Sequence, residues 1–251
     1  MSLLVRTILR LSQSVSFRLK NRLKRVALRG TPLAAAGYPT FDGYELLCRL
    51  KSTPPRVIYD LGANRGHWTL LAKSIFPDSE VHGFEPLPDH CADFTVRTRA
   101  LRTVHLHAVA LGEAAAELEM DITSFSDSAS LLAPTATMAE TYNVRSGAKA
   151  FVPVVRLDDW VDSHSIPPPD LVKLDLQGYE LHALRGAPGC LRHARAVLLE
   201  LSFREYYAGQ PKPGELIAHL EATGFRLAAF SPDLPAGQSL EQADALFVRA
   251  D

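Results

Sequence analysis

The chain is poor in cysteine. Its 251 residues include three, Cys48, Cys91 and Cys190, which lie far apart and form no Cys-x-x-Cys pair. An odd number of widely spaced cysteines argues against a disulfide framework and against a zinc knuckle. Such usage is typical of a reducing compartment, so the sequence predicts a cytoplasmic protein.

A long apolar run is also missing. No stretch of 18 or more consecutive apolar residues occurs, whereas a helix that spans a bilayer needs about 20. The sequence therefore predicts no membrane-spanning helix. The composition, 47% hydrophobic and 22% charged, instead suits a single α/β domain with a sizeable core.

Acidic residues are absent from the first 30 positions. This segment holds eight Lys or Arg residues, so the remainder of the chain carries more acidic than basic groups. An enzyme that acts on nucleic acid commonly presents a broad basic face around its site. We therefore expect no nucleic acid among the partners.

Apolar side chains recur at helical spacing within this basic segment. They predict an amphipathic helix over residues 3–20 and are Leu4, Ile8, Leu11, Val15 and Leu19. Three interpretations remain open: residues 1–30 contact the inner face of a membrane, form an organelle presequence, or add a helix that packs on the domain. We divide the chain into a basic helical extension, residues 1–50, and a main domain, residues 51–251.

The main domain opens with a strand, a glycine turn and a helix. Val57–Asp60 is an apolar, β-branched run that ends in an acid, and Gly62 and Gly66 follow before His67 begins a helical pattern. In this geometry backbone N–H groups and a helix N-terminus approach a ligand. The spacing differs from Gly-x-Gly-x-x-Gly, which disfavours an NAD-dependent oxidoreductase.

Acidic residues end four of the predicted strands. They are Asp60, Glu85, Asp175 and Glu200. The carboxyl ends of parallel strands form one edge of a sheet, where ligands bind in open α/β folds. Because a half-buried carboxylate is costly unless it is paired, this recurrence indicates a binding site. Glu85, after the second strand, is placed to accept hydrogen bonds from both ribose hydroxyls of a nucleoside.

Residues 113–156 depart from the alternation of strand and helix. Glu117–Thr123 and Phe151–Arg156 predict two paired strands. The polar stretch Ser124–Ala139 between them predicts either a lid over the sheet edge or a disordered surface loop.

Two histidines, His105 and His107, alternate along the third predicted strand and face one side. We interpret them as packing and surface residues, because the sequence places no third metal ligand beside them.

The ends of the main domain complete the predicted architecture. Thr40–Lys51 predicts a helix before the first strand. Phe225–Phe230 and Ala245–Arg249 predict a final hairpin, because the stretch between them is too short for a good crossover helix. The predicted fold is α/β, an open doubly wound, mostly parallel seven-stranded sheet with an antiparallel last strand.

An ordered set of short motifs resembles the FkbM family of methyltransferases that use S-adenosylmethionine (SAM). The motifs are Val57–Gly66, Gly83–Pro86, Ala108–Gly112, Arg156–Asp159, Lys173–Glu180 and Leu184–Ala187, followed by Glu200. The resemblance covers about Val57 to Phe230 and leaves residues 1–50 outside. The family pattern often has Glu where this chain has Gln177, so no acid–base role is transferred to that position.

The resemblance implies a Rossmann-like class I methyltransferase fold, SAM as the cofactor and methyl transfer to an oxygen. We expect the cofactor to contact Asp60, Gly62, Ala63, Asn64, Gly66, Glu85, Pro86 and Ala110. For the transfer, Asp175 is our candidate for the base that takes the acceptor proton. Glu180 and Glu200 are the next candidates.

The predicted reaction is O-methylation of a hydroxyl on a saccharide or a secondary metabolite. The sulfonium of SAM is already a strong electrophile, so we assign no metal ligand; a variant in which Asp175 and Glu200 hold a divalent cation remains open. The alternative is a non-catalytic module that binds SAM or another metabolite and is anchored by the basic N-terminal helix. Such a module needs no acid after the fourth strand, so Asp175 favours the enzyme.

Overall fold

The computed structural model describes residues 18–124, 128–144, 146–231 and 240–250. A seven-stranded sheet of order β3-β2-β1-β7-β8-β10-β9 forms its centre. Its strands are β1 (Val57–Leu61), β2 (Glu80–Phe84), β3 (Val104–His107), β7 (Leu171–Leu174), β8 (Ala196–Ser202), β9 (Phe225–Phe230) and β10 (Gln242–Arg249). β10 is antiparallel to both of its neighbours, and the other pairs are parallel. The predicted fold class is confirmed.

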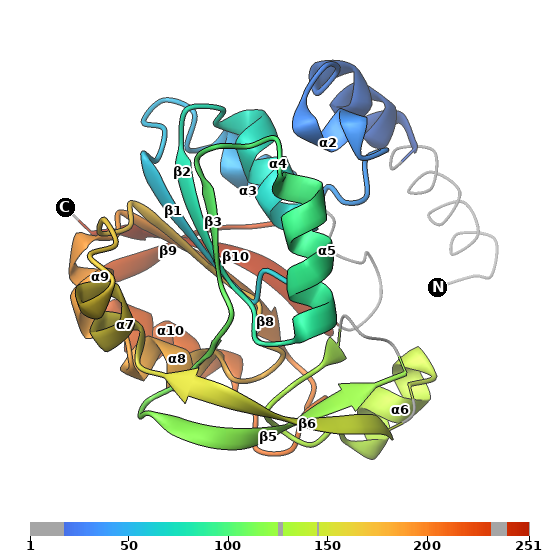
Figure 1. Cartoon of the computed structure of the whole chain (residues 1–251), viewed down its shortest axis with the longest axis vertical. Helices are drawn as coiled ribbons and strands as arrows, with labels where there is room; N and C mark the ends of the chain where they lie inside the picture. Colours follow the sequence, from blue (N-terminus) through green and yellow to red (C-terminus); the bar gives the residue numbers. More distant parts are fainter. Residues whose placement is uncertain (1–17, 125–127, 145, 232–239, 251) are drawn as a thin grey trace, which may run out of the picture.

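Helices cover both faces of this sheet (Figure 1). One face carries α2 (Pro32–Ala35), α3 (Tyr44–Cys48), α4 (His67–Ile75) and α5 (Pro88–Thr98), and the other carries α7 (Leu157–Ser163), α8 (Glu180–Arg185), α9 (Pro188–His193) and α10 (Pro213–Ala222). Alternate residues of the central strands face the two layers. Ile58 and Leu198 are buried in the first core, and Tyr59 and Val197 in the second. Burial on both faces explains why most residues of these strands are apolar.

The segment before β1 shares the first core. Leu28, Leu33, Leu46 and Leu47 are buried there together with residues of α4. The helix predicted over Thr40–Lys51 is too long, because α3 spans only Tyr44–Cys48. Gly43, directly before it, has a left-handed backbone (φ 76°) that interrupts a helix.

A second, three-stranded sheet lies across the carboxyl ends of the main strands (Figure 1). It has the order β4-β6-β5 and comprises β4 (Ala110–Leu111), β5 (Ala116–Thr123) and β6 (Ser146–Val155). The predicted pairing of the two long strands is confirmed, and the structure shows that it is antiparallel. β6 begins earlier than predicted, and α6 (Ala136–Tyr142) begins inside the stretch predicted as a loop. The hydroxyl of Thr135 caps this helix by accepting the Met138 N–H.

The predicted N-terminal helix over residues 3–20 falls mostly outside the described residues. Residues 18–27 are helical, so a helix extends past the predicted end. Within the described part of the chain, none of the helices combines the length and the apolarity needed to cross a bilayer.

Candidate active site

The turn after β1 requires glycine at its first position. Gly62 has φ 78°, and a Cβ built on it would lie 2.0 Å from the carbonyl oxygen of Asp175. The N–H groups of Gly62 and Ala63 both donate to the carbonyl of Phe84 at 3.0 Å. Gly66, with φ 83°, is the N-cap residue of α4. The turn therefore brings the ends of β1, β2 and β7 together, as the motif predicted.

Glu85 is held in position by its neighbours after β2. Its Oε2 accepts the N–H of Asn64 at 3.0 Å, and its Oε1 accepts the N–H of Leu87 at 2.9 Å. His90 from α5 lies 3.3 Å from the same Oε1. A carboxylate has about four acceptor positions, so capacity remains for hydroxyls of a ligand. His90 was not identified from the sequence.

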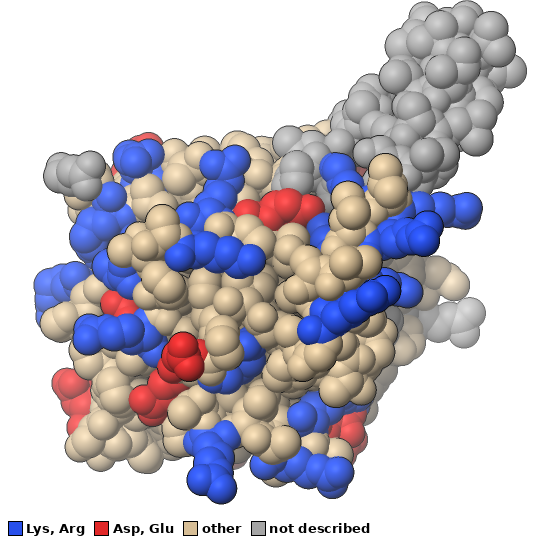
Figure 2. Space-filling model, turned by 90° about the horizontal axis from the view of Figure 1, so that it is seen from above, with Lys and Arg blue, Asp and Glu red and all other residues tan. Residues whose placement is uncertain are grey.

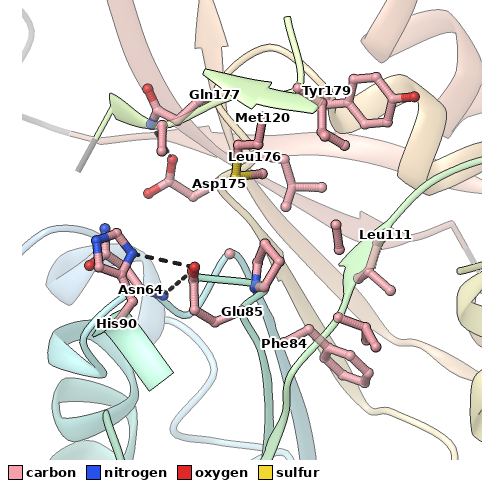
Figure 3. Close-up of a pocket in the computed structure, with 16 residues that line it drawn as sticks. Asn64, Phe84, Glu85, His90, Leu111, Met120, Asp175, Leu176, Gln177 and Tyr179 are labelled. Carbon is pink, nitrogen blue, oxygen red and sulfur yellow. Dashed lines mark hydrogen bonds and ion pairs between the residues drawn. The ribbon is translucent and has the colours of Figure 1, made fainter. Parts of the chain in front are cut away.

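Glu85 lines a pocket with an apolar wall (Figure 3). The wall combines residues that follow β2 and β3 with residues of the small sheet and its loop: Phe84, Pro86, Val109, Ala110, Leu111, Met120, Ala129 and Leu131. Gly62, Asn64 and Asp175 complete the lining. The excursion predicted as a lid or a disordered loop thus supplies part of this wall.

Asp60 does not line this pocket. It is fully buried (0% exposed), accepts the hydroxyl of Thr69 at 2.6 Å and forms an ion pair with Lys173 at 3.1 Å. Lys173 also donates to the carbonyl of Gly62 at 3.2 Å. Burial lowers the pKa of Lys173, but the carboxylates of Asp60 and Asp175 outweigh it and raise the pKa above its usual value. The buried ion pair therefore holds the glycine turn.

Asp175 follows β7 and lies between two donors. Its Oδ1 accepts the side-chain N–H of Gln177 at 2.6 Å, and its Oδ2 is 3.6 Å from Nζ of Lys173. Its side chain is 44% exposed. Asp175 is thus accessible from the pocket, and its role as a base stays a prediction.

Unlike Asp175, Glu180 has a buried carboxylate that is already hydrogen-bonded to the backbone. It is buried, and its Oε1 accepts the N–H groups of Leu176 at 2.9 Å and Gly178 at 3.2 Å. These bonds close the turn between β7 and α8. The structure therefore gives Glu180 a positioning role, and the prediction that it is a candidate base loses its geometric support.

Glu200, on β8, is surrounded by other acids. Burial and then the nearby carboxylates of Asp175 and Asp244 raise its pKa well above the usual value. Its Oε2 accepts the side-chain amide N–H of Gln242 at 2.6 Å. A carboxylate with a raised pKa can exchange a proton near neutral pH.

A second hollow of about 380 Å³ adjoins the pocket at Glu85. Both are lined by Gly62, Asn64, Asp175 and Gln177. The hollow adds Glu200 and aromatic or apolar side chains from several elements: Trp68, Met138, Tyr142, Tyr206 and Tyr207. Asp175 and Gln177 therefore lie where two bound molecules would meet.

Residues 60–227 match the profile of the family described as Methyltransferase FkbM domain. This chain belongs to the FkbM methyltransferase family. The protein is accordingly a SAM-dependent methyltransferase, as the motifs predicted.

Two characterised relatives are similar to this FkbM methyltransferase over part of their length. The 2-O-methyltransferase NoeI of Sinorhizobium fredii is 27% identical over 168 residues, 64% of this chain and 69% of that protein. The hexuronic acid methyltransferase AglP of Haloferax volcanii is 26% identical over 147 residues, 58% of this chain and 55% of that protein.

Solved structures show a more distant similarity. Fibrillarin of Aeropyrum pernix, solved with natively bound SAM, has a TM-score of 0.45 and 14% identity and covers 78% of this chain and 66% of its own. A precorrin-6y methyltransferase of Geobacter metallireducens has a TM-score of 0.47 and 12% identity. The match covers 82% of this chain and 88% of that protein. Similarity at this level carries no information about the acceptor.

The chemistry of the pocket agrees with SAM as its ligand. SAM has a ribose, an adenine and an amino-acid tail, for which the pocket offers the Glu85 carboxylate, an apolar wall and the backbone of the glycine turn. Of the predicted cofactor residues, Gly62, Asn64, Glu85, Pro86 and Ala110 line the pocket and Ala63 lines the hollow. Asp60 and Gly66 lie behind the lining and shape the turn.

Proposed function

We propose that this FkbM methyltransferase transfers the methyl group of SAM to a hydroxyl of a sugar or glycan. The observation that carries the proposal is the shared lining of the two cavities at Asp175 and Gln177. The activities of NoeI, a 2-O-methyltransferase, and AglP, a hexuronic acid methyltransferase, support a sugar acceptor. Bound SAM supplies an electrophilic methyl group.

The chain itself orients the acceptor and receives its proton. Tyrosine and tryptophan rings in the hollow offer flat apolar faces and polar tips, which suit a sugar ring with its hydroxyls. Asp175 is our proposed proton acceptor, because it is exposed to both cavities. Alignment of the acceptor oxygen contributes several kcal/mol to lowering the barrier.

The floor of the hollow favours an acceptor without negative charge. Asp42, Asp175 and Glu200 line it. Two cations, Lys173 and Arg65, also line it, and they form ion pairs with Asp60 and Asp93. A uronate carboxylate would be repelled there. We therefore propose a neutral or amino sugar as the acceptor.

A panel of acceptors tests both statements. The full chain is incubated with SAM and matched neutral, amino and uronic sugars, and methylated product is measured by mass spectrometry. We expect product with neutral or amino sugars and little with the uronate. Equal methylation of the uronate would contradict the charge preference, and methylation of nitrogen in place of oxygen would contradict O-methyl transfer.

We further propose that the N-terminal helix places the enzyme at the cytoplasmic face of an anionic membrane. Leu19, Leu23 and Val26 follow i, i+4, i+7 spacing and are 57%, 60% and 50% exposed. Arginines precede each position of this stripe and lie along its side: Arg18, Arg22 and Arg25, continued by Arg29. An exposed apolar stripe beside a basic one suits a helix at a lipid interface.

The opposite face of this helix rests on the domain. Lys24 is buried and forms an ion pair with Glu45 at 2.8 Å, and Leu28 enters the core. Lys24 also lies over the rings of Phe41 and Tyr44. Lys and Arg outnumber acidic residues on the face of the molecule seen in Figure 2, the side on which residues 18–36 lie in Figure 1. The stripe of Leu19, Leu23 and Val26 thus points away from the body.

Liposome sedimentation tests the membrane proposal. The full chain should bind anionic vesicles at low salt and release them at high salt, because the attraction is screened. The triple variant Leu19→Gln, Leu23→Gln, Val26→Gln should lose binding, whereas Val96→Gln, which removes an exposed apolar residue elsewhere, should not. A dimer that dissociates in the triple variant, without vesicle binding in either form, would assign the stripe to self-association instead.

A further inference from the structure

Three potential metal ligands converge on β2 and β3, at the edge of the sheet. His82 is paired directly with His105 across the two strands, and Glu80 precedes His82 by two residues, so all three side chains share a face. Oε1 of Glu80 lies 3.1 Å from Nε2 of His82 and 3.3 Å from Nε2 of His105. Among the described residues, this is the one group whose three ligand atoms lie within 4.8 Å of one another.

These distances match the ligand shell of a small cation. Ligand atoms about 2.1 Å from a tetrahedral zinc ion lie about 3.4 Å from each other. Two imidazole nitrogens and one carboxylate oxygen are ligands that zinc accepts. The His105 side chain is 45% exposed and that of Glu80 36%, whereas that of His82 is 6% exposed. The group is therefore anchored in the protein by His82 and open to solvent at a fourth position.

Hydrogen bonds from neighbouring side chains fix the ring of His82. The indole N–H of Trp160, in α7, donates to Nδ1 of His107 at 3.3 Å. His107 must then carry its proton on Nε2, which lies 3.1 Å from Nδ1 of His82. His82 is left with its proton on Nε2, facing Glu80.

The geometry points to a zinc site formed by Glu80, His82 and His105, separate from the methyl-transfer site. The ion would link β3, the edge strand, to β2, because His105 lies on β3 and the other two ligands lie on β2. Both strands lead into the cofactor pocket, β2 into Glu85 and β3 into Val109 and Ala110. Zinc would therefore stabilise the wall on which SAM is expected to bind.

Zinc binding has a consequence for the proton positions. The proton on Nε2 of His82 moves to Nδ1 and is donated to His107, whose own proton moves from Nε2 to Nδ1. No net proton is released from this pair, but Nδ1 of His107 can no longer accept the indole N–H of Trp160. The fluorescence of Trp160 should report this change.

Calorimetric titration of the metal-free full chain with zinc chloride tests the proposal. We expect one ion per chain with a Kd of about 1 μM or below, and a higher Tm in the presence of zinc. His105→Ala and Glu80→Gln should each weaken binding about ten-fold or more and remove the rise in Tm. His193→Ala, which removes another exposed histidine, is the matched control and should bind zinc as the wild type does.

Fluorescence gives an independent measurement on the same samples. Zinc should change the tryptophan emission of the wild type but not that of Trp160→Phe, although this variant should still bind the ion. Absence of a wild-type binding isotherm up to about 100 μM zinc, an affinity too weak for a built site, would overturn the proposal. Unchanged binding in His105→Ala would also overturn it, because the ion would then lie elsewhere.

Discussion

The side-chain amide of Gln177 donates a 2.6 Å hydrogen bond to Asp175 and accepts one from the hydroxyl of Tyr207 at 2.8 Å. The two contacts fix the orientation of the amide, since its nitrogen only donates and its oxygen only accepts. The Tyr207 hydroxyl also lies 3.0 Å from the carbonyl of Ser128, in the described part of the loop before α6. Gln177 therefore connects the proposed base with two walls of the acceptor hollow.

The first prediction follows from this contact. Gln177→Glu replaces the donor toward Asp175 with a second carboxylate. Because a like charge favours the protonated form of its neighbour, the rising limb of the pH–rate profile should move to higher pH. Gln177→Met removes the donor without adding charge and is the matched control. Identical pH profiles for the two variants would show that a charge at position 177 does not change the pKa of the base.

The second prediction concerns the proton acceptor. Asp175→Asn keeps the shape of the side chain and removes its charge, so SAM affinity should stay near normal while kcat falls by about 10² to 10⁴. Calorimetry and single-turnover kinetics separate the two quantities. Loss of SAM binding, with turnover preserved at saturating SAM, would make Asp175 a cofactor ligand.

Glu200 is distinguished from Asp175 by its pH dependence. Burial and neighbouring acids raise its pKa, so activity that depends on its ionised form should rise with pH above the usual range of a carboxylate. Glu200→Gln should then remove this rise from the pH–rate profile. If the rise of activity with pH persists in Glu200→Gln and vanishes in Asp175→Asn, Asp175 alone causes it.

The cofactor pocket gives the next prediction. If Glu85 binds the ribose hydroxyls, Glu85→Ala should weaken SAM binding by about 1.5 to 3 kcal/mol. Glu85 also accepts the N–H groups of Asn64 and Leu87, so Glu85→Gln, which retains an acceptor oxygen, should lose less. Calorimetry on folded variants measures both, and unchanged affinity in Glu85→Ala would remove Glu85 from the site.

Much of this arrangement could be predicted from the sequence. Motifs fix local backbone geometry, so the glycine turn with Gly62 was predictable, and the parallel order of the strands brings Glu85, Asp175 and Glu200 to one edge. Long-range pairings leave no local pattern. Lys173 is a single charge in an apolar strand, and its ion pair with Asp60 appears only when β1 and β7 are adjacent.

The acceptor hollow and the histidine group were missed for the same reason. Tyr207 and Gln177 are 30 positions apart, and no periodicity relates them. His105 was assigned to surface and packing because its partners, Glu80 and His82, lie on the neighbouring strand. Which residues become neighbours in these two sites depends on how distant segments of the chain pair, and a local sequence pattern does not contain that information.

The last prediction concerns the effect of the buried Asp244, on β10, on the stability of the protein. Burial, and then the carboxylates of Asp42 and Asp175, raise the pKa of Asp244 from 3.8 to about 7, against the opposing effect of Lys173. Between these values the folded protein keeps a proton that the unfolded chain has released. The free energy of unfolding should therefore fall as the pH rises from about 4 to about 7 and level off above it.

Asp244→Asn resembles the protonated form at every pH. Its Tm should match that of the wild type near pH 4 and exceed it near pH 8, because only the wild type then carries the buried negative charge. Asp162→Asn, at an exposed position of α7, is the control and should follow the wild type throughout. If the variant is instead less stable than the wild type at pH 8, the prediction is wrong. The attraction between Lys173 and the Asp244 carboxylate would then outweigh burial and the repulsion from Asp42 and Asp175.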